Sequence, residues 1–136
     1  MSAPKKVRVN NYNTGIAAEY FVLSQLYRQN IEAYITIGNK KSIDIRIIKK
    51  DGTPISLDVK AVRGYTSLIV NNITHSPNHY FAFVVYNERF ENIEYMPEIY
   101  ILHSMMTKDI IKQYNKELRI MKGDILGYLN QWELLK

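Results

Sequence analysis

Two short segments of alternating polarity, separated by a turn sequence, constrain the fold of this chain more than any other feature. Residues 42–48 and residues 55–61 each carry an apolar side chain at every second position. The alternating apolar residues are Ile43, Ile45, Ile47, Ile55, Leu57 and Val59. Residues 50–53 read Lys-Asp-Gly-Thr, which is typical of a hairpin turn. Because side chains alternate between the two faces of a strand, the pattern predicts a hairpin with one apolar face against a core.

The polar face of this predicted hairpin holds the side chains that can bind a metal or take part in catalysis. On the first strand, Asp44 points to the face opposite that of the isoleucines. On the second strand, Asp58 and Lys60 are two residues apart, so these two side chains share a face. If the turn pairs the strands directly, the two carboxylates come close together. Two close carboxylates repel one another unless a cation lies between them, and Mg²⁺ prefers oxygen ligands. A carboxylate-bound Mg²⁺ beside a lysine can hold a scissile phosphate and stabilise the developing charge. Alternatively, all three are solvent-facing residues of an edge strand.

An amphipathic segment before the hairpin adds a third carboxylate. Apolar residues recur at helical spacing after a possible cap at Asn13-Thr14, which predicts a helix over residues 14–29 with one buried face. The recurring residues are Ile16, Tyr20, Leu23 and Tyr27. Glu19 falls about 40° from Leu23 and about 20° from Leu26 on a helical wheel, so it lies on the apolar face. A carboxylate there needs a partner, which a metal or Lys60 would supply. Otherwise Glu19 is a rim residue or a structural ion-pair partner.

The rest of the chain indicates a sheet with helices around it. Residues 33–37, 68–70, 80–86 and 99–102 have strand character. Residues 80–86 are almost entirely apolar, as expected of a central strand that is covered on both faces. We expect a helix from Thr107 to about residue 115 and a short final helix after Asp124. The order predicts an α/β fold with a mixed central sheet flanked by helices. We expect residues 1–136 to form a single domain, with residues 1–10 as a flexible basic arm.

Composition narrows the function classes. The chain has no cysteine, which excludes disulfides, thiolate zinc sites and cysteine nucleophiles. No apolar run approaches the roughly 20 residues that span a bilayer, and the first residues do not read as a secretory signal. We therefore expect a soluble cytoplasmic protein without a membrane partner. The net charge of +5 is a mild bias towards polyanionic partners.

The order of these motifs resembles that of the PD-(D/E)XK nuclease superfamily, and in particular its small members similar to Holliday junction resolvases. The matching segments are Gly15-Ile-Ala-Ala-Glu19, Ser42-Ile-Asp44-Ile45, Asp51-Gly52, Ile55-Ser-Leu-Asp58-Val-Lys60 and the tail around Trp132. The chain departs from the motif in having Ile43 where the proline stands and Asp58 where glutamate is usual.

The resemblance implies a restriction-endonuclease-like αβββαβ core, a divalent cofactor (Mg²⁺ or Mn²⁺) and phosphodiester hydrolysis. Asp44 and Asp58 would bind the metal, and Glu19 would be a further metal or water ligand. Lys60 would position the attacking water and stabilise the transition state.

The resemblance also suggests what the chain acts on. We expect a DNA endonuclease that works as a homodimer, since two cuts need two sites. Lys40, Lys41 and Arg63 flank the expected site and could contact DNA phosphates, and Tyr65 could touch nucleic acid. The alternative for these residues is an ordinary solvated surface. The alternative function is a catalytically inactive protein of the same fold that binds nucleic acid or a protein partner.

Overall fold

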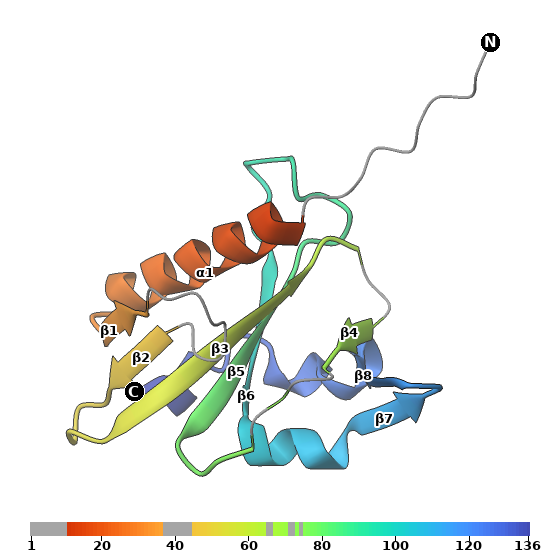
Figure 1. Ribbon diagram of the computed structural model, residues 1–136. Helices are drawn as coiled ribbons and strands as arrows, with labels where there is room; N and C mark the ends of the chain where they lie inside the picture. Colours follow the sequence, from red (N-terminus) through yellow and green to blue (C-terminus); the bar gives the residue numbers. More distant parts are fainter. Residues whose placement is uncertain (1–10, 37–44, 65–66, 71–72, 74) are drawn as a thin grey trace.

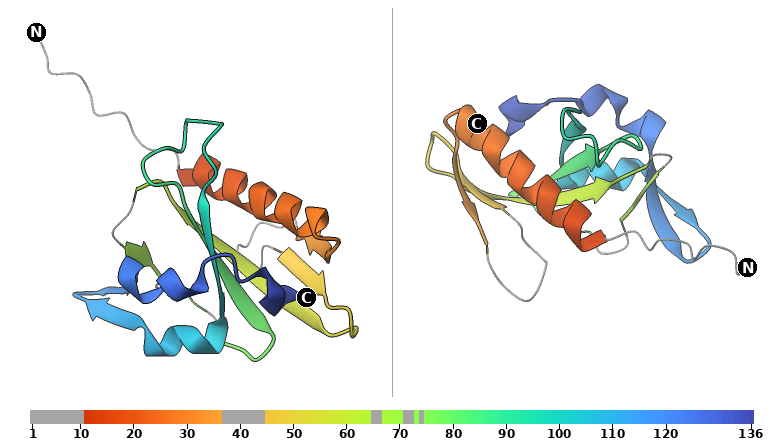
Figure 2. Two further views of the ribbon diagram at one scale, coloured as in Figure 1. Left: turned by 180° about the vertical axis from the view of Figure 1, so that it is seen from behind. Right: turned by 90° about the horizontal axis from the view of Figure 1, so that it is seen from above.

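The computed structural model describes residues 11–36, 45–64, 67–70, 73 and 75–136. A five-stranded sheet lies at its centre, in the order β1-β2-β3-β5-β6 (Figure 1). The strands are β1 (Glu32–Ile35), β2 (Ile45–Ile48), β3 (Pro54–Val62), β5 (His79–Val85) and β6 (Glu98–His103). The helix α1 (Asn11–Arg28) packs on one face, and a three-stranded sheet lies on the other (Figures 1 and 2). Its order is β4 (Ser67–Ile69), β8 (Glu117–Met121) and β7 (Ile111–Tyr114).

The predicted hairpin is confirmed. Strands β2 and β3 pair antiparallel, from Ile45 opposite Leu57 to Ile48 opposite Pro54. Gly52 has φ of 89°, a conformation that costs glycine little. The Thr53 N–H donates to Asp51 Oδ1 over 2.9 Å, and this bond lowers the pKa of the Asp51 carboxyl. The turn chemistry thus sets the strand register locally.

Strand β5 is the central strand that its apolar sequence predicted. It pairs parallel with β3 and antiparallel with β6, so the sheet is mixed. Its alternate residues belong to two different cores. Ala82 and Val84 pack on the side of α1, whereas Phe81, Phe83 and Val85 pack on the side of the smaller sheet. Because both faces of β5 are covered, side chains on both faces are buried, so its sequence is apolar throughout instead of alternating.

The helix α1 is longer than predicted and buries a different stripe. It begins at Asn11, so Thr14 lies within the helix instead of capping it. Tyr20 and Tyr27, expected on the buried face, are 55% and 53% exposed. The buried residues are Thr14, Ala18, Val22, Leu23 and Leu26. Small and branched side chains let the helix approach the sheet, and the amphipathic tyrosines lie at the rim, where the Tyr27 hydroxyl donates to the Ala33 carbonyl.

The C-terminal third contains most of the wrong predictions. The helix expected over residues 107–115 is instead a 3₁₀ turn (Ser104–Asp109) followed by β7, and β8 was not predicted. Asn115 has φ of 54° and reverses the chain between the two strands. After Asp124 the chain forms 3₁₀ turns, Leu126–Tyr128 and Trp132–Leu135, in place of an α-helix. Between β3 and β5 the described residues contain β4 and no α-helix.

Membrane topology can be stated for the same residues. None of the helices formed by the described part of the chain is long and apolar enough to cross a membrane.

Candidate active site

Strand β3 places Asp58 and Lys60 side by side on one face of the central sheet. Asp58 lies opposite Phe81 of the parallel strand β5, and Lys60 lies opposite Phe83. Both phenylalanines belong to the core under the smaller sheet, so Asp58 and Lys60 face away from α1. The Lys60 ammonium lies 3.4 Å from Asp58 Oδ2. The predicted shared face of these two residues is therefore confirmed.

The Asp58 carboxylate is unusually buried for a charged group. The residue is only 5% exposed, whereas the side chain of Lys60 is 28% exposed. Transfer of an ionised carboxylate out of water costs several kcal/mol unless cations or hydrogen-bond donors compensate it. Lys60 supplies one such cation. The pair combines a sheltered anion with a cation that still reaches solvent, an arrangement suited to a charged substrate or metal.

Glu19 lies on the other side of the central sheet. It is half-buried on α1, on the helix face that also carries the buried Leu23 and Leu26, as predicted. That face packs against the odd-numbered residues of β3, such as Val59. Within the described ranges, no group of three His, Cys, Asp or Glu residues could hold a metal ion. The predicted convergence of Glu19 with Asp58 stays a prediction.

The strand pairing of β3 leaves one place where a side chain can reach from one face of the central sheet to the other. In the described residues β2 accompanies β3 only as far as Leu57, while β5 accompanies it to Val62. A side chain from α1 would have to pass the β2 edge of β3, beyond Leu57, to reach Asp58.

Four of the predicted site residues lie outside the described residues: Lys40, Lys41, Asp44 and Tyr65. Their roles stay predictions. Asp44 is bonded directly to Ile45, whose partner Leu57 directly precedes Asp58.

Arg63, predicted to contact DNA, makes contacts within the protein. Its Nε donates to the Thr14 hydroxyl over 2.7 Å, and its guanidinium lies 4.0 Å from the centre of the Phe90 ring. Its Nη1 also lies 3.9 Å from a Glu91 carboxylate oxygen. These contacts tie the start of α1 to the end of β3 and to the segment after β5. Arg63 therefore has a structural role that the sequence did not indicate.

Arg46 is a cation near the site that the prediction overlooked. It lies opposite Ser56 in the β2–β3 pair, on the same face as Asp58 and Lys60, and it is exposed. The alternation of residues 42–48 had already placed it on the polar face. Behind it, Ser56 Oγ and His79 Nδ1 are hydrogen-bonded over 2.6 Å, which fixes the neighbouring positions of β3 and β5.

Comparison with known proteins identifies the architecture. No family model matches the sequence, and no curated protein matches it. Among solved structures, the chain is similar to the bacterial homing endonuclease I-Ssp6803I, with a TM-score of 0.61, 14% identity and coverage of 92% of this chain and 91% of that one. It is also similar to Hjc, a Holliday junction resolvase from Archaeoglobus fulgidus. That TM-score is 0.59 at 14% identity, covering 90% of this chain and 100% of the other.

Both of these proteins have the restriction-endonuclease-like fold. The likeness covers 92% of this chain in the first comparison and 90% in the second. The protein therefore has the restriction-endonuclease-like fold, as its motif order predicted.

Proposed function

We propose that this chain is a metal-dependent endonuclease that hydrolyses DNA phosphodiester bonds, with Asp58 and Lys60 at the centre of its active site. The observation that carries the proposal is the buried Asp58 carboxylate beside the Lys60 ammonium on β3. The fold likeness to a homing endonuclease and a Holliday junction resolvase supports it.

The donor chemistry of the site suits Mg²⁺ or Mn²⁺. Carboxylate oxygens are the ligands that these ions prefer, and water or phosphate oxygens can complete an incomplete protein shell. Asp58 supplies one carboxylate, and the proposal needs Asp44, with Glu19 as a further candidate, to supply the others. When bound, such an ion lowers the pKa of a coordinated water and stabilises charge on the phosphate.

The protein side chains have separate roles in this proposal. Lys60 reaches solvent on its ammonium end, so it can donate hydrogen bonds to the scissile phosphate and orient the attacking water. Arg46, exposed on the same face, binds a neighbouring phosphate of the same strand. Phe81 and Phe83 lie beside the pair on β5, on the same face of the sheet, and limit the access of bulk water from that side.

One observation favours the alternative, a protein of this fold that binds nucleic acid or a protein partner without cutting. Lys60 lies 3.4 Å from Asp58 Oδ2 and compensates its charge, so the pair is balanced without a metal. An Asp58–Lys60 ion pair could then be structural. This alternative predicts DNA binding that is independent of a divalent metal and no strand cleavage.

A cleavage assay separates the two functions. The full chain is incubated with supercoiled plasmid and with four-way junction DNA, in Mg²⁺, in Mn²⁺ or in EDTA. We expect cleavage only with metal, and its loss in Asp58→Asn and Lys60→Ala. Glu94→Gln and Lys50→Ala are matched controls, because they remove one exposed charge of the same sign and should leave cleavage intact.

Two results would end the enzyme proposal. One is no cleavage of either DNA together with no metal binding by calorimetric titration. The other is cleavage that survives Asp58→Asn. The expected homodimer is tested on the same samples by sedimentation equilibrium, with and without DNA.

A further inference from the structure

The outer face of the smaller sheet carries a cavity away from Asp58 and Lys60. Alternate residues of β4, β7 and β8, such as Leu68 and Ile120, point into the core, so their neighbours point outwards. The outward residues are Ser67, Ile69, Lys112, Tyr114, Glu117, Arg119 and Met121. Tyr114 and Ile69 are 46% and 50% exposed. This face thus combines an exposed aromatic ring with charged side chains.

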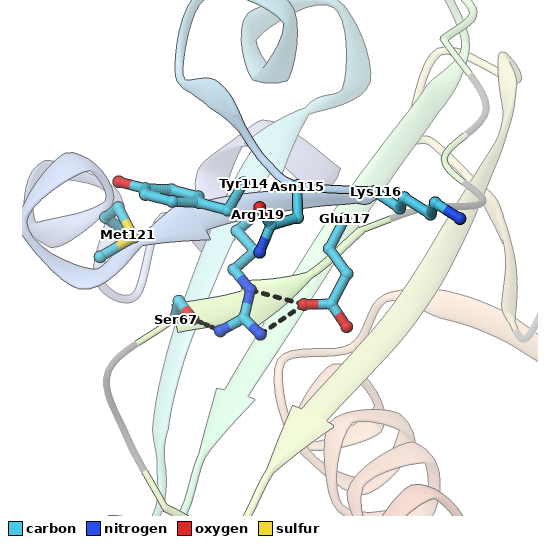
Figure 3. A pocket seen from close by; sticks show the side chains of 7 residues that line it. All are labelled: Ser67, Tyr114, Asn115, Lys116, Glu117, Arg119 and Met121. Atoms are coloured by element: carbon cyan, nitrogen blue, oxygen red, sulfur yellow. Dashed lines mark hydrogen bonds and ion pairs between the residues drawn. The ribbon is translucent and has the colours of Figure 1, made fainter.

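The cavity on this face has a volume of about 570 Å³ and a polar floor (Figure 3). Arg119 forms the floor. Its Nη1 donates to Ser67 Oγ and its Nε donates to Glu117 Oε2, each over 2.9 Å, and its Nη2 also donates to Glu117. Tyr114 and Met121 form an apolar wall, and Lys116 extends from the hairpin tip (Figure 3). The cavity thus combines the flat ring of Tyr114, the carboxylate of Glu117 held by Arg119, and the cation of Lys116 at its rim.

Charge is distributed unevenly between the two ends of the molecule. Residues 108–122 contain five basic and two acidic residues, whereas residues 87–98 contain one basic and four acidic residues. The first set is Lys108, Lys112, Lys116, Arg119 and Lys122 against Asp109 and Glu117. The second is Arg89 against Glu88, Glu91, Glu94 and Glu98. The loop after β5 and the β7–β8 hairpin lie at opposite ends of the fold (Figures 1 and 2). A polyanion is therefore drawn towards the hairpin.

We infer that the outer face of the β7–β8 hairpin binds a DNA strand, with an unpaired base stacked on Tyr114 in the cavity and Lys116 on a flanking phosphate. The inference rests on the proposed function for its choice of DNA as the ligand. A base fits the cavity better than a phosphate does, because the Glu117 carboxylate repels phosphate. The same carboxylate accepts hydrogen bonds from the amino groups of bases. Stacking on an aromatic ring needs no particular base.

The position of the hairpin connects it with the cleavage site. The smaller sheet packs on the same face of the central sheet that carries Asp58 and Lys60, and β3 leads directly into β4. A strand held at Lys60 can thus continue over Ser67 to Tyr114. An unpaired base at this point would favour branched or frayed DNA over continuous duplex.

The test measures binding without metal, so that it does not depend on cleavage. Fluorescence anisotropy in EDTA gives the affinity of the full chain for a labelled single strand and for the same strand in a duplex. We expect Tyr114→Ala to weaken single-strand binding roughly 5- to 100-fold and duplex binding less. Tyr114→Phe should retain wild-type affinity because it keeps the ring. Lys116→Gln should reduce the slope of log affinity against log salt by about 0.7 for the single strand.

The matched control is Tyr20→Ala, which removes a tyrosine that is 55% exposed on α1, on the opposite side of the central sheet from the hairpin. Equal affinity of Tyr114→Ala and wild type for the single strand would overturn the inference, as would an equal loss in Tyr20→Ala. A dimer that Tyr114→Ala dissociates, with DNA affinity unchanged, would assign the face to a second copy of the chain instead.

The two proposals fail separately. If Tyr114→Ala impairs binding but no DNA is ever cut, the hairpin inference stands and the nuclease proposal falls. If cleavage depends on Asp58 while Tyr114→Ala binds normally, the outcome is the reverse. Circular dichroism confirms that each variant is folded, and Tyr114→Phe guards against a folding effect.

Discussion

At Asp58 one face of β3 is as deeply buried as the other, yet the two faces hold opposite kinds of side chain there. Ile55 and Val59, which face α1, are 3% and 8% exposed, and Asp58 between them, on the other face, is 5% exposed. The apolar face gains stability from burial, at about 1.5–3 kcal/mol for a large side chain. On the other face, burial of the Asp58 carboxylate lowers the stability of the fold, because it removes a charge from water. Burial alone therefore does not separate a core position from a candidate site, whereas burial of a charge beside a cation does.

The largest effect is expected on the polar face. Asp58→Asn keeps the size of the side chain but removes its charge, so cleavage should fall by about a thousand-fold while the fold is retained. Cleavage rates under single-turnover conditions and the urea unfolding curve measure the two quantities. A large loss of stability with unchanged cleavage per folded molecule would reverse the comparison and make Asp58 a structural residue.

The apolar face should show the opposite behaviour. Ile55→Ala leaves a cavity against α1, which should lower the free energy of unfolding by about 2–5 kcal/mol. Urea denaturation measures this loss, and cleavage per folded molecule should remain close to wild type. Ser56→Ala, the neighbour on the polar face, is the control. It removes one hydrogen bond to His79 and should cost only about 0.5–1.5 kcal/mol.

Substitution of Arg63 tests whether the end of β3 serves the stability of the fold or the binding of DNA. Arg63→Gln removes the bond to Thr14 and the contact with the Phe90 ring, so unfolding should become about 1–3 kcal/mol easier. The salt dependence of DNA affinity should not change. Arg28→Gln, an exposed arginine at the end of α1, should leave stability close to wild type. A smaller salt slope in Arg63→Gln would restore the predicted DNA contact.

The smallest effect is expected two strands away, at Tyr100 of β6, which lies on the same face of the central sheet as Asp58. Burial, and then the hydrogen bond to Glu98, raise the pKa of Tyr100 to about 12. A raised pKa means that the unfolded chain ionises first. Its contribution to stability is therefore complete below about pH 10 and is lost as the pH rises through 12. Tyr100→Phe should show a weaker loss of stability in this window than wild type, measured by unfolding at graded alkaline pH. Equal pH slopes would contradict the shift.

Local pattern accounts for the parts of the fold that were predicted correctly. The hairpin and the shared face of Asp58 and Lys60 follow from a period of two and a glycine turn, which act between near neighbours. The burial of β5 follows from its unbroken apolar sequence. The wrong predictions arose where two local interpretations compete. Residues 107–115 contain both a possible cap and the β-branched Ile111 of β7, and only pairing with β8 decides between helix and strand. Tyr20 and Tyr27 matched helical spacing, but packing selected the smaller Ala18 and Val22.

The sequence by itself determined which residues share a face of each strand, because the direction of a side chain along a strand is a property of the backbone. It also determined the order of motifs that identified the fold. Only the tertiary structure decided which face α1 covers. That choice places Glu19 and Asp58 on opposite sides of the central sheet, and it depends on the summed fit of many buried side chains. The Arg63–Thr14 contact, between residues 49 positions apart, was invisible to local pattern for the same reason. The tertiary structure likewise separated the Asp58–Lys60 pair from the cavity at Tyr114, which suggested a second place where DNA is held.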